Sequence, residues 1–134
     1  MKVNKEEMIG MLVALEIYLQ KDHARERAEF DKRAETIRSS AVAVPGVSAE
    51  VFVPEVANHV PHIRISWDAG AKGFTADEVV TALREGEPSI GTRAERDAVV
   101  VGIWMMRSGE EKVVARRLRE VLQKGVQRQK TAER

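Results

Sequence analysis

The feature that most constrains the fold is the N-terminal helical segment, because its first half is apolar on every side. Asn4 and Glu7 have the spacing of a helix-capping box, and no proline interrupts the chain from there to about Ser39. A helix that is apolar all round must be covered all round. The rest of the chain could cover only one side, so we expect a missing large domain or partner subunit to contact Met8, Leu12, Leu15 and Leu19.

The remainder of the chain reads as strands and shorter helices. Apolar and polar residues alternate over residues 47–53 and 62–67, as in strands with one buried face. A short strand is expected near residues 89–93, and residues 98–105 have the apolar run of a central strand buried on both faces. Thr75 with Glu78 and Ser108 with Glu111 predict two further helix starts.

These elements predict an α+β fold of order α-β-β-α-β-β-α. We expect a long N-terminal helix followed by a small, mostly antiparallel sheet with helices packed on one face. The expected division is a linking helix over residues 1–39, a small α+β C-terminal domain over 40–124, and a basic, disordered tail over 125–134.

Composition excludes several kinds of chemistry. The chain of 134 residues has no cysteine, so disulfides, thiolate metal sites and cysteine nucleophiles are excluded, which fits a cytoplasmic protein. The 22 basic and 21 acidic residues nearly cancel, and no long apolar run predicts a membrane span. No nucleophile-elbow or phosphate-loop motif is present. These patterns give no candidate for a catalytic residue in this chain, and nucleic-acid binding has only the basic tail in its favour, as a weak tRNA-binding element.

Two histidines and two arginines are the candidate site residues. His59 and His62 have the spacing of a metal-binding pair, but Pro61 prevents a regular helix from presenting both on one face, so we expect no metal site. Both a site-lining role and a structural role stay open for them. Arg64 and Arg93 lie in or beside predicted strands, where a guanidinium can bind a carboxylate or phosphate, or merely cover an exposed sheet face.

Three segments carry a resemblance to a known family: residues 1–10 (MKVNKEEMIG), 57–64 (ANHVPHIR) and 83–90 (LREGEPSI). Together they resemble the C-terminal portion of fold-type-I pyridoxal-phosphate-dependent enzymes of the selenocysteine synthase-like group, related to L-seryl-tRNA(Sec) selenium transferase. The resemblance implies that the chain begins where the family's large domain ends. That domain would carry the Schiff-base lysine and the cofactor site, so pyridoxal phosphate (PLP) is not expected to bind this chain alone.

The resemblance also ranks the candidate residues. Arg93 best resembles the small-domain arginine that holds a substrate carboxylate in related enzymes, and Arg64 is second. Asn58, His59 and His62 resemble a family motif to which chemistry assigns no role, and we place them with the substrate-binding candidates.

The resulting hypothesis is a small-domain fragment or subunit of a PLP-dependent transferase or lyase that acts on a small amino acid. The domain would help to close and line the substrate site without catalysing a reaction alone, and we expect a homo-oligomer. The alternative is a stand-alone α+β dimerisation or regulatory module without enzymatic activity.

Overall fold

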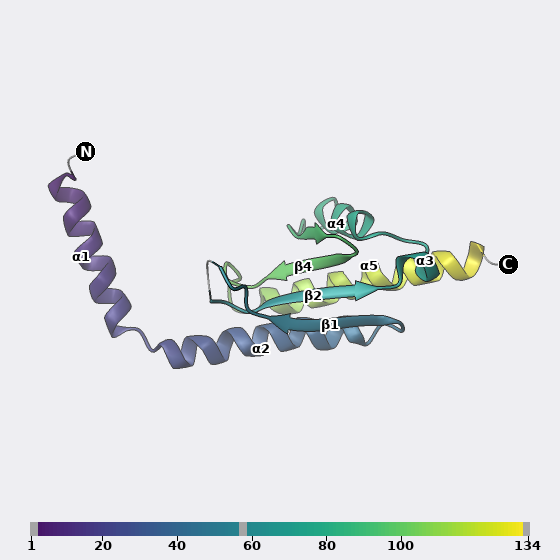
Figure 1. Cartoon of the computed structure of the whole chain (residues 1–134), viewed down its shortest axis with the longest axis horizontal. Coiled ribbons are helices and arrows are strands. Elements are labelled where there is room, and N and C mark those ends of the chain that lie inside the picture. The colour runs from purple at the N-terminus through teal and green to yellow at the C-terminus, as the bar shows by residue number, and fades with distance from the viewer. Residues whose placement is uncertain (1–2, 57–58, 133–134) are drawn as a thin grey trace.

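The computed structural model describes residues 3–56 and 59–132, which form five helices and four strands within these ranges. The helices and strands follow one another along the chain as shown in Figure 1. In order they are α1 (Lys5–Gln20), α2 (His23–Val42), β1 (Val47–Phe52), β2 (His62–Trp67), α3 (Ala69–Lys72), α4 (Ala76–Arg84), β3 (Arg93–Glu95), β4 (Ala98–Gly102) and α5 (Glu110–Ala132).

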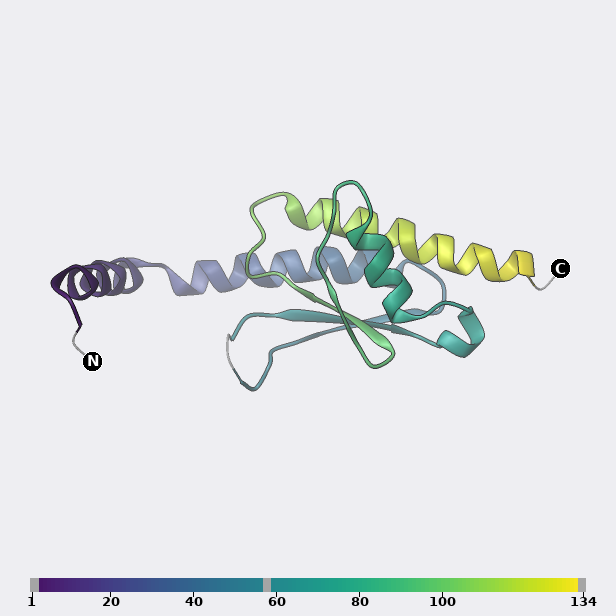
Figure 2. The same cartoon turned by 90° about the horizontal axis from the view of Figure 1, so that it is seen from above.

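The four strands form one sheet in the order β1-β2-β4-β3, and every neighbouring pair is antiparallel. α2, α4 and α5 cover one face of this sheet, as the view from above in Figure 2 shows. The α+β class, the antiparallel sheet and the packing of the helices on one face are therefore confirmed.

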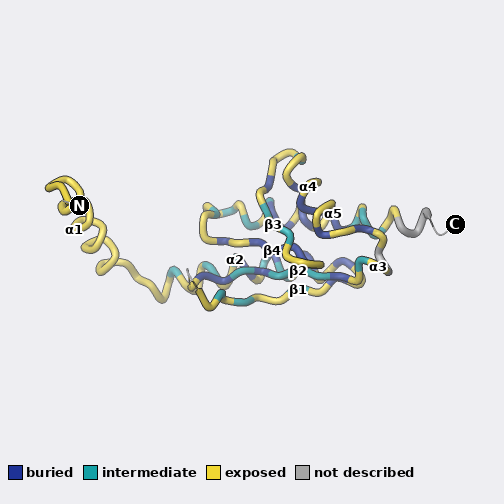
Figure 3. Tube along the Cα trace, turned by 45° about the horizontal axis from the view of Figure 1, so that its top comes forward, coloured by how far each residue is buried: buried dark blue, intermediate teal, exposed yellow. Residues whose placement is uncertain are grey.

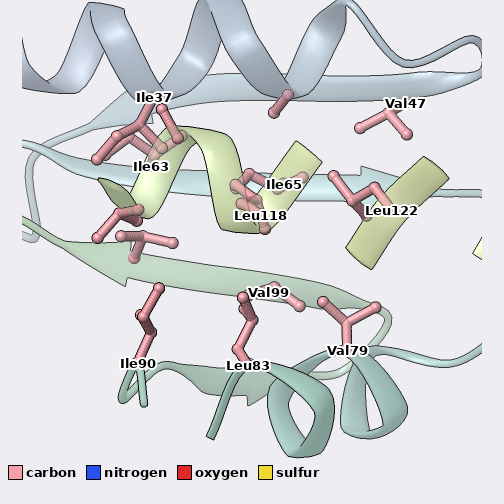
Figure 4. Close-up of a cluster of buried hydrophobic side chains, with 14 of the residues drawn as sticks. Ile37, Val47, Ile63, Ile65, Val79, Leu83, Ile90, Val99, Leu118 and Leu122 are labelled. Atoms are coloured by element: carbon pink, nitrogen blue, oxygen red, sulfur yellow. The ribbon is translucent and has the colours of Figure 1, made fainter. Parts of the chain in front are cut away.

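The core lies between the sheet and these three helices. Ile63 and Ile65 of β2 point into it, together with Val99 of β4, because alternate residues of a strand share a face. Figure 4 shows these side chains meeting side chains from all three helices. The helical contributions are Ile37 from α2, Val79 and Leu83 from α4, and Leu118 and Leu122 from α5.

The expected single N-terminal helix is wrong, since the structure has two helices joined at Lys21 and Asp22. Lys21 takes an extended backbone conformation (φ −74°, ψ 135°), and the Asp22 side chain accepts a hydrogen bond from the backbone N–H of Arg25 at 2.9 Å. Asp22 thus caps a new helix. α1 points away from the rest of the molecule in Figure 1 and is exposed along its whole length in Figure 3.

The last helix also differs from expectation at both ends. Its first residue is Glu110, because Gly109 has φ 95° and the backbone N–H of Arg107 donates to the Glu110 carboxylate at 2.9 Å. The predicted cap at Ser108 is therefore not the one formed. The helix continues to Ala132, so most of the segment that was expected to be a disordered tail is helical.

The central strand β4 is shorter than its apolar run. Ala98, Val99, Val100 and Val101 are all buried, as expected for a central strand, although the helices cover only one face of the sheet. The strand ends at Gly102, and Trp104 and Met105 are exposed at 55% and 83%. Among the described residues, no helix has the length and apolar character that crossing a membrane requires.

Candidate functional site

The candidate site lies on the face of the sheet that no described helix covers. Strand alternation places Glu50 and Phe52 of β1 on this open face, opposite Arg64 and His62 of β2. Val100 of β4 pairs with Arg64 of β2 on one side and with Arg93 of β3 on the other. The structure therefore brings three of the five predicted site residues, His62, Arg64 and Arg93, onto one surface.

Arg64 is held in place by its neighbours on the sheet. Its Nη1 atom lies 2.7 Å from the Glu50 carboxylate, its Nη2 atom lies 3.9 Å from Glu95, and its guanidinium carbon is 4.2 Å from the centre of the Phe52 ring. Two carboxylates thus already compensate its charge, and the ring fixes its orientation. Exposed ion pairs of this kind contribute little stability, about 0–1 kcal/mol. Their main effect is to fix the position of the guanidinium.

Arg93 is the freer of the two arginines. Its side chain is 66% exposed, and its one ion pair in the described part of the chain, with Glu95, is long at 3.7 Å. The turn after α4 positions it. The backbone N–H of Ile90 donates to the Leu83 carbonyl at 2.9 Å, and the Ser89 hydroxyl donates to the Arg84 carbonyl at 2.6 Å, which folds the chain back into β3.

His62 has one nitrogen bound and one available. Its Nδ1 atom lies 2.9 Å from the carbonyl oxygen of Val60, and because a carbonyl only accepts, Nδ1 carries the hydrogen. The neutral ring then has Nε2 as an acceptor. Nε2 faces Gly102, where a side chain would begin 3.3 Å away. The absence of a side chain at Gly102 therefore keeps this nitrogen accessible.

An open hollow of about 310 Å³ lies between these groups, and its lining includes His62, Thr92, Arg93 and Val100. The Thr92 hydroxyl is buried and has no hydrogen-bond partner in the described part of the chain. A guanidinium and an imidazole nitrogen beside one hollow suit a small anionic or polar group, since the first donates hydrogen bonds and the second accepts one.

The other two predicted site residues are not brought to this hollow by the structure. His59 is exposed on the connection between β1 and β2 and does not line the hollow; its backbone carbonyl accepts a hydrogen bond from Arg27 at 3.3 Å. Asn58 lies outside the described residues. Among the residues that are described, no group of three or more histidine, aspartate or glutamate side chains could hold a metal ion.

Sequence reasoning missed four residues of this face: Glu50, Phe52, Thr92 and Glu95. Strand alternation was a sufficient signal for Glu50 and Phe52, which share the polar face of β1. Glu95 follows Arg93 by two residues and so shares its side of β3. Thr92 gave no sequence signal, since only packing decides whether a threonine hydroxyl is buried without a partner.

The exposed surface of α1 is a second candidate site, at which another domain or subunit would bind. α1 has no buried residue in the structure. Nine of its large apolar side chains are between 48% and 73% exposed, among them Met8, Leu12, Leu15 and Leu19. Exposed apolar surface of this extent marks an interaction site.

Comparison with known proteins shows that the chain is similar to one part of larger enzymes. No family model matches it. It is 30% identical over 126 residues to D-glucosaminate-6-phosphate ammonia lyase of Salmonella typhimurium (strain 14028s / SGSC 2262), covering 90% of this chain and 32% of the lyase. It is 29% identical over 126 residues to 5'-C-glycyluridine monooxygenase-decarboxylase of a Streptomyces species, covering 91% of this chain and 31% of that enzyme.

The solved structure of D-glucosaminate-6-phosphate ammonia-lyase gives the same result. It matches with a TM-score of 0.65 at 29% identity, over 93% of this chain and 34% of the lyase chain. The chain thus spans about a third of the length of the relatives it matches. It is related, in sequence and in fold, to one part of larger enzymes whose names describe lyase and decarboxylase activities.

Proposed function

We propose that this chain is the small C-terminal domain of a PLP-dependent lyase or transferase, and that the open face of its sheet forms one wall of the substrate site. The observation that carries the proposal is the match over nine-tenths of this chain to a third of an ammonia lyase, in both sequence and fold. The resemblance to the selenocysteine synthase-like group supports the same reading of the domain, with PLP bound by the part of the enzyme outside this chain.

The substrate in this proposal is a small amino acid bound through its carboxylate. The relatives are named for D-glucosaminate-6-phosphate, a carboxylate, and for 5'-C-glycyluridine, which has a glycyl group. Arg93 is suited to hold such a carboxylate because its guanidinium is largely exposed and only loosely paired. Arg64, held by Glu50, would place a positive charge beside it, while His62 would accept a hydrogen bond from a polar group of the substrate through Nε2.

The exposed apolar side chains of α1 would be covered by the large domain or by a partner subunit. This assignment accounts for a helix that the rest of the described chain leaves bare. PLP, when bound in the large domain, would supply the stabilisation of a carbanion at the amino-acid carbon. This chain would supply substrate binding and exclusion of water.

Gene context and reconstitution test the proposal together. We expect the DNA upstream to encode, in frame or in an adjacent gene, a segment roughly twice as long as this chain with a PLP-binding lysine. The purified chain alone, treated with PLP and borohydride, should give no stoichiometric adduct. Co-expression with the upstream segment should give a complex with visible absorbance from PLP. Absence of any such segment, or stoichiometric labelling of the chain alone, would overturn the proposal.

In that complex, Arg93→Gln should raise KM for the amino-acid substrate about ten- to hundredfold, as expected for loss of a charge-assisted hydrogen bond. The matched control is Arg119→Gln, which removes the same charge from the helical side of the molecule. An unchanged KM in the Arg93 variant would show that the open face does not hold the carboxylate.

The second candidate function is a dimerisation or regulatory module without enzymatic activity, and the bare helix α1 is the observation in its favour. Analytical ultracentrifugation of the isolated chain separates the two candidates. A single, stable dimer over a wide concentration range would favour the module. Indefinite, concentration-dependent association would favour a domain that lacks its partner.

A further inference from the structure

A second hollow lies on the helical side of the sheet, between α4 and α5. Its volume is about 210 Å³. Arg117, Lys124 and Arg128 line it from one side of α5, and apolar walls come from Phe74, just before α4, and from Val79 of α4. Because α4 and α5 cover the face opposite the candidate substrate wall, an occupant here would not touch His62, Arg64 or Arg93.

The apolar wall of this hollow is rigid. The Phe74 ring stacks on Trp67 with ring centres 4.9 Å apart, and the indole Nε1 of Trp67 donates to the Phe74 carbonyl at 2.9 Å. On its other side the ring lies directly on α5 at Gly125, where a Cβ atom would come within 2.8 Å of it. A wall fixed in this way makes a preformed site, so little ordering entropy would be lost on binding.

The positively charged side chains around the hollow are not fully paired with carboxylates, which favours binding of an anion. The one carboxylate in the lining, Glu78, already accepts hydrogen bonds from the backbone and hydroxyl of Thr75, which lower its pKa, with Arg128 lowering it further. Lys124 has no ion pair with any described carboxylate.

Arg117 is the third cation, and only one edge of it is satisfied. Its Nη1 atom pairs with Glu120, while its buried Nε hydrogen has no acceptor in the described part of the chain. Lys124, which has no ion pair among the described residues, and Arg128, which has Glu78 nearby, therefore lie with the Arg117 guanidinium around a small, partly apolar space.

We propose that this hollow binds a small organic anion, a carboxylate or phosphate monoester attached to one ring or a short apolar chain. The apolar part would lie against Phe74 and Val121, and the anionic group would lie between Lys124 and Arg128. The volume is below the roughly 300 Å³ at which pockets begin to hold drug-sized ligands, which limits the occupant to about one ring. The proposal does not depend on the enzymatic role of the sheet's open face.

The test is a titration of the isotopically labelled full chain with phenyl phosphate, benzoate, phenol and inorganic phosphate, followed by NMR. We expect saturable shifts of the Gly125 amide and the Phe74 ring protons with phenyl phosphate or benzoate, and much weaker binding of phenol and of inorganic phosphate. The tighter of the two aryl anions identifies the anionic group that the hollow prefers.

A pair of charge-matched variants locates the site. Lys124→Gln with Arg128→Gln should weaken binding at least tenfold. Arg116→Gln with Arg119→Gln removes the same charge from α5 outside the hollow and should leave binding unchanged. Circular dichroism should show that both variants fold. The proposal is overturned if no saturable shift appears at Gly125 or Phe74 by about 10 mM ligand, if phenol binds as well as the anions, or if both variants weaken binding equally.

Discussion

At the scale of single residues, neighbouring side chains decide what each charged group can do. Arg64 and Arg93 lie on the same sheet face, yet Arg64 contacts two carboxylates and an aromatic ring, whereas Arg93 has one loose ion pair. Glycines show the same dependence on context. Gly10 has open space around it, while Gly125 lies directly against the Phe74 ring.

The Glu35 carboxylate illustrates how strongly one pair of neighbours can act. Hydrogen bonds from Arg38 and Ser39 lower its pKa from 4.5 to about 2. A carboxyl group whose pKa is lower in the folded state stabilises the fold above its unfolded pKa. That contribution is lost as pH falls from about 4.5 toward 2. Arg38→Gln should raise the Glu35 pKa by at least one unit toward 4.5, as measured by NMR titration of the carboxyl carbon.

The control for this prediction is Arg27→Gln on the same helix. Arg27 pairs with Asp31 and does not contact Glu35, so its loss should leave the Glu35 titration unchanged. A Glu35 pKa near 2 in the Arg38 variant would show that the lowering has another cause.

Gly125→Ala should destabilise the chain by about 1–3 kcal/mol, the usual cost of overpacking a core. The added Cβ would lie 2.8 Å from a Phe74 ring that Trp67 prevents from moving. Gly10→Ala is the matched control, because it adds the same atom in open space on α1; it favours that helix locally by up to about 1 kcal/mol and should leave unfolding of the packed core unchanged. Urea unfolding measures both, and equal stability of the two variants would contradict the close packing at Phe74.

At the scale of elements, α1 is the one that lacks a packing partner within the described chain. A helix with no buried residue gains little from tertiary contacts, so it depends on its capping box, its helix propensity and a local contact of Tyr18 with His23. Asn4 and Glu7 satisfy each other's backbone N–H groups at 2.8 and 3.1 Å. In the proposed function, the exposed apolar side chains of α1 serve association with another domain or subunit.

Replacing both Leu12 and Leu15 by lysine should abolish concentration-dependent association of the chain and raise its solubility, because the charges cannot be buried in an interface. Sedimentation velocity at several concentrations measures the effect. Gln20→Lys adds charge to the same helix without removing an apolar side chain, and it should leave association largely intact. Equal association of the leucine variant and the parent chain would contradict an interface on α1.

At the scale of the whole molecule, the packed unit begins at α2. Apart from α1, the helices of the described chain share one core with the sheet, and α2 and α5 pack closely against each other. Figure 3 shows that burial is confined to this part of the described chain. The packed unit should therefore be independent of α1.

Removing residues 1–21 should leave the melting temperature of the remaining chain within about 2 °C of the parent. The new terminus would be Asp22, which retains its capping contact with Arg25. Thermal unfolding followed by circular dichroism gives the result. A fall of more than about 5 °C would mean that α1 contributes to the stability of the core.

Much of this architecture could be predicted from the sequence, because the local helix-capping and strand-alternation signals agree with the final fold. The Asn4–Glu7 and Thr75–Glu78 capping boxes form as their spacing predicts, and strand alternation assigns the faces of β1 and β2. The break at Lys21 was not predictable from composition, since no proline or glycine marks it and Asp22 is compatible with both helix and cap. Helix α5 begins at Glu110, and not directly after the predicted cap at Ser108, because Gly109 takes a positive φ.

The candidate site was predictable only in part, for a similar reason. Period-two alternation places His62 and Arg64 on one face. The meeting of Arg93 with them depends on the strand order, in which β4 lies between β2 and β3, and a local pattern does not contain that information. The buried hydroxyl of Thr92 depends on packing across several segments.

The position of β1 at the border of the sheet has a consequence for aggregation. A border strand offers unpaired backbone groups to which a strand of another molecule can add. Pro45 and Pro54 flank β1, which limits any added ladder to about the six residues of the strand, and Glu50 puts a charge at its middle. These three residues act as gatekeepers, so intermolecular β-sheet growth from this border should be slow even when the apolar helix brings two molecules together.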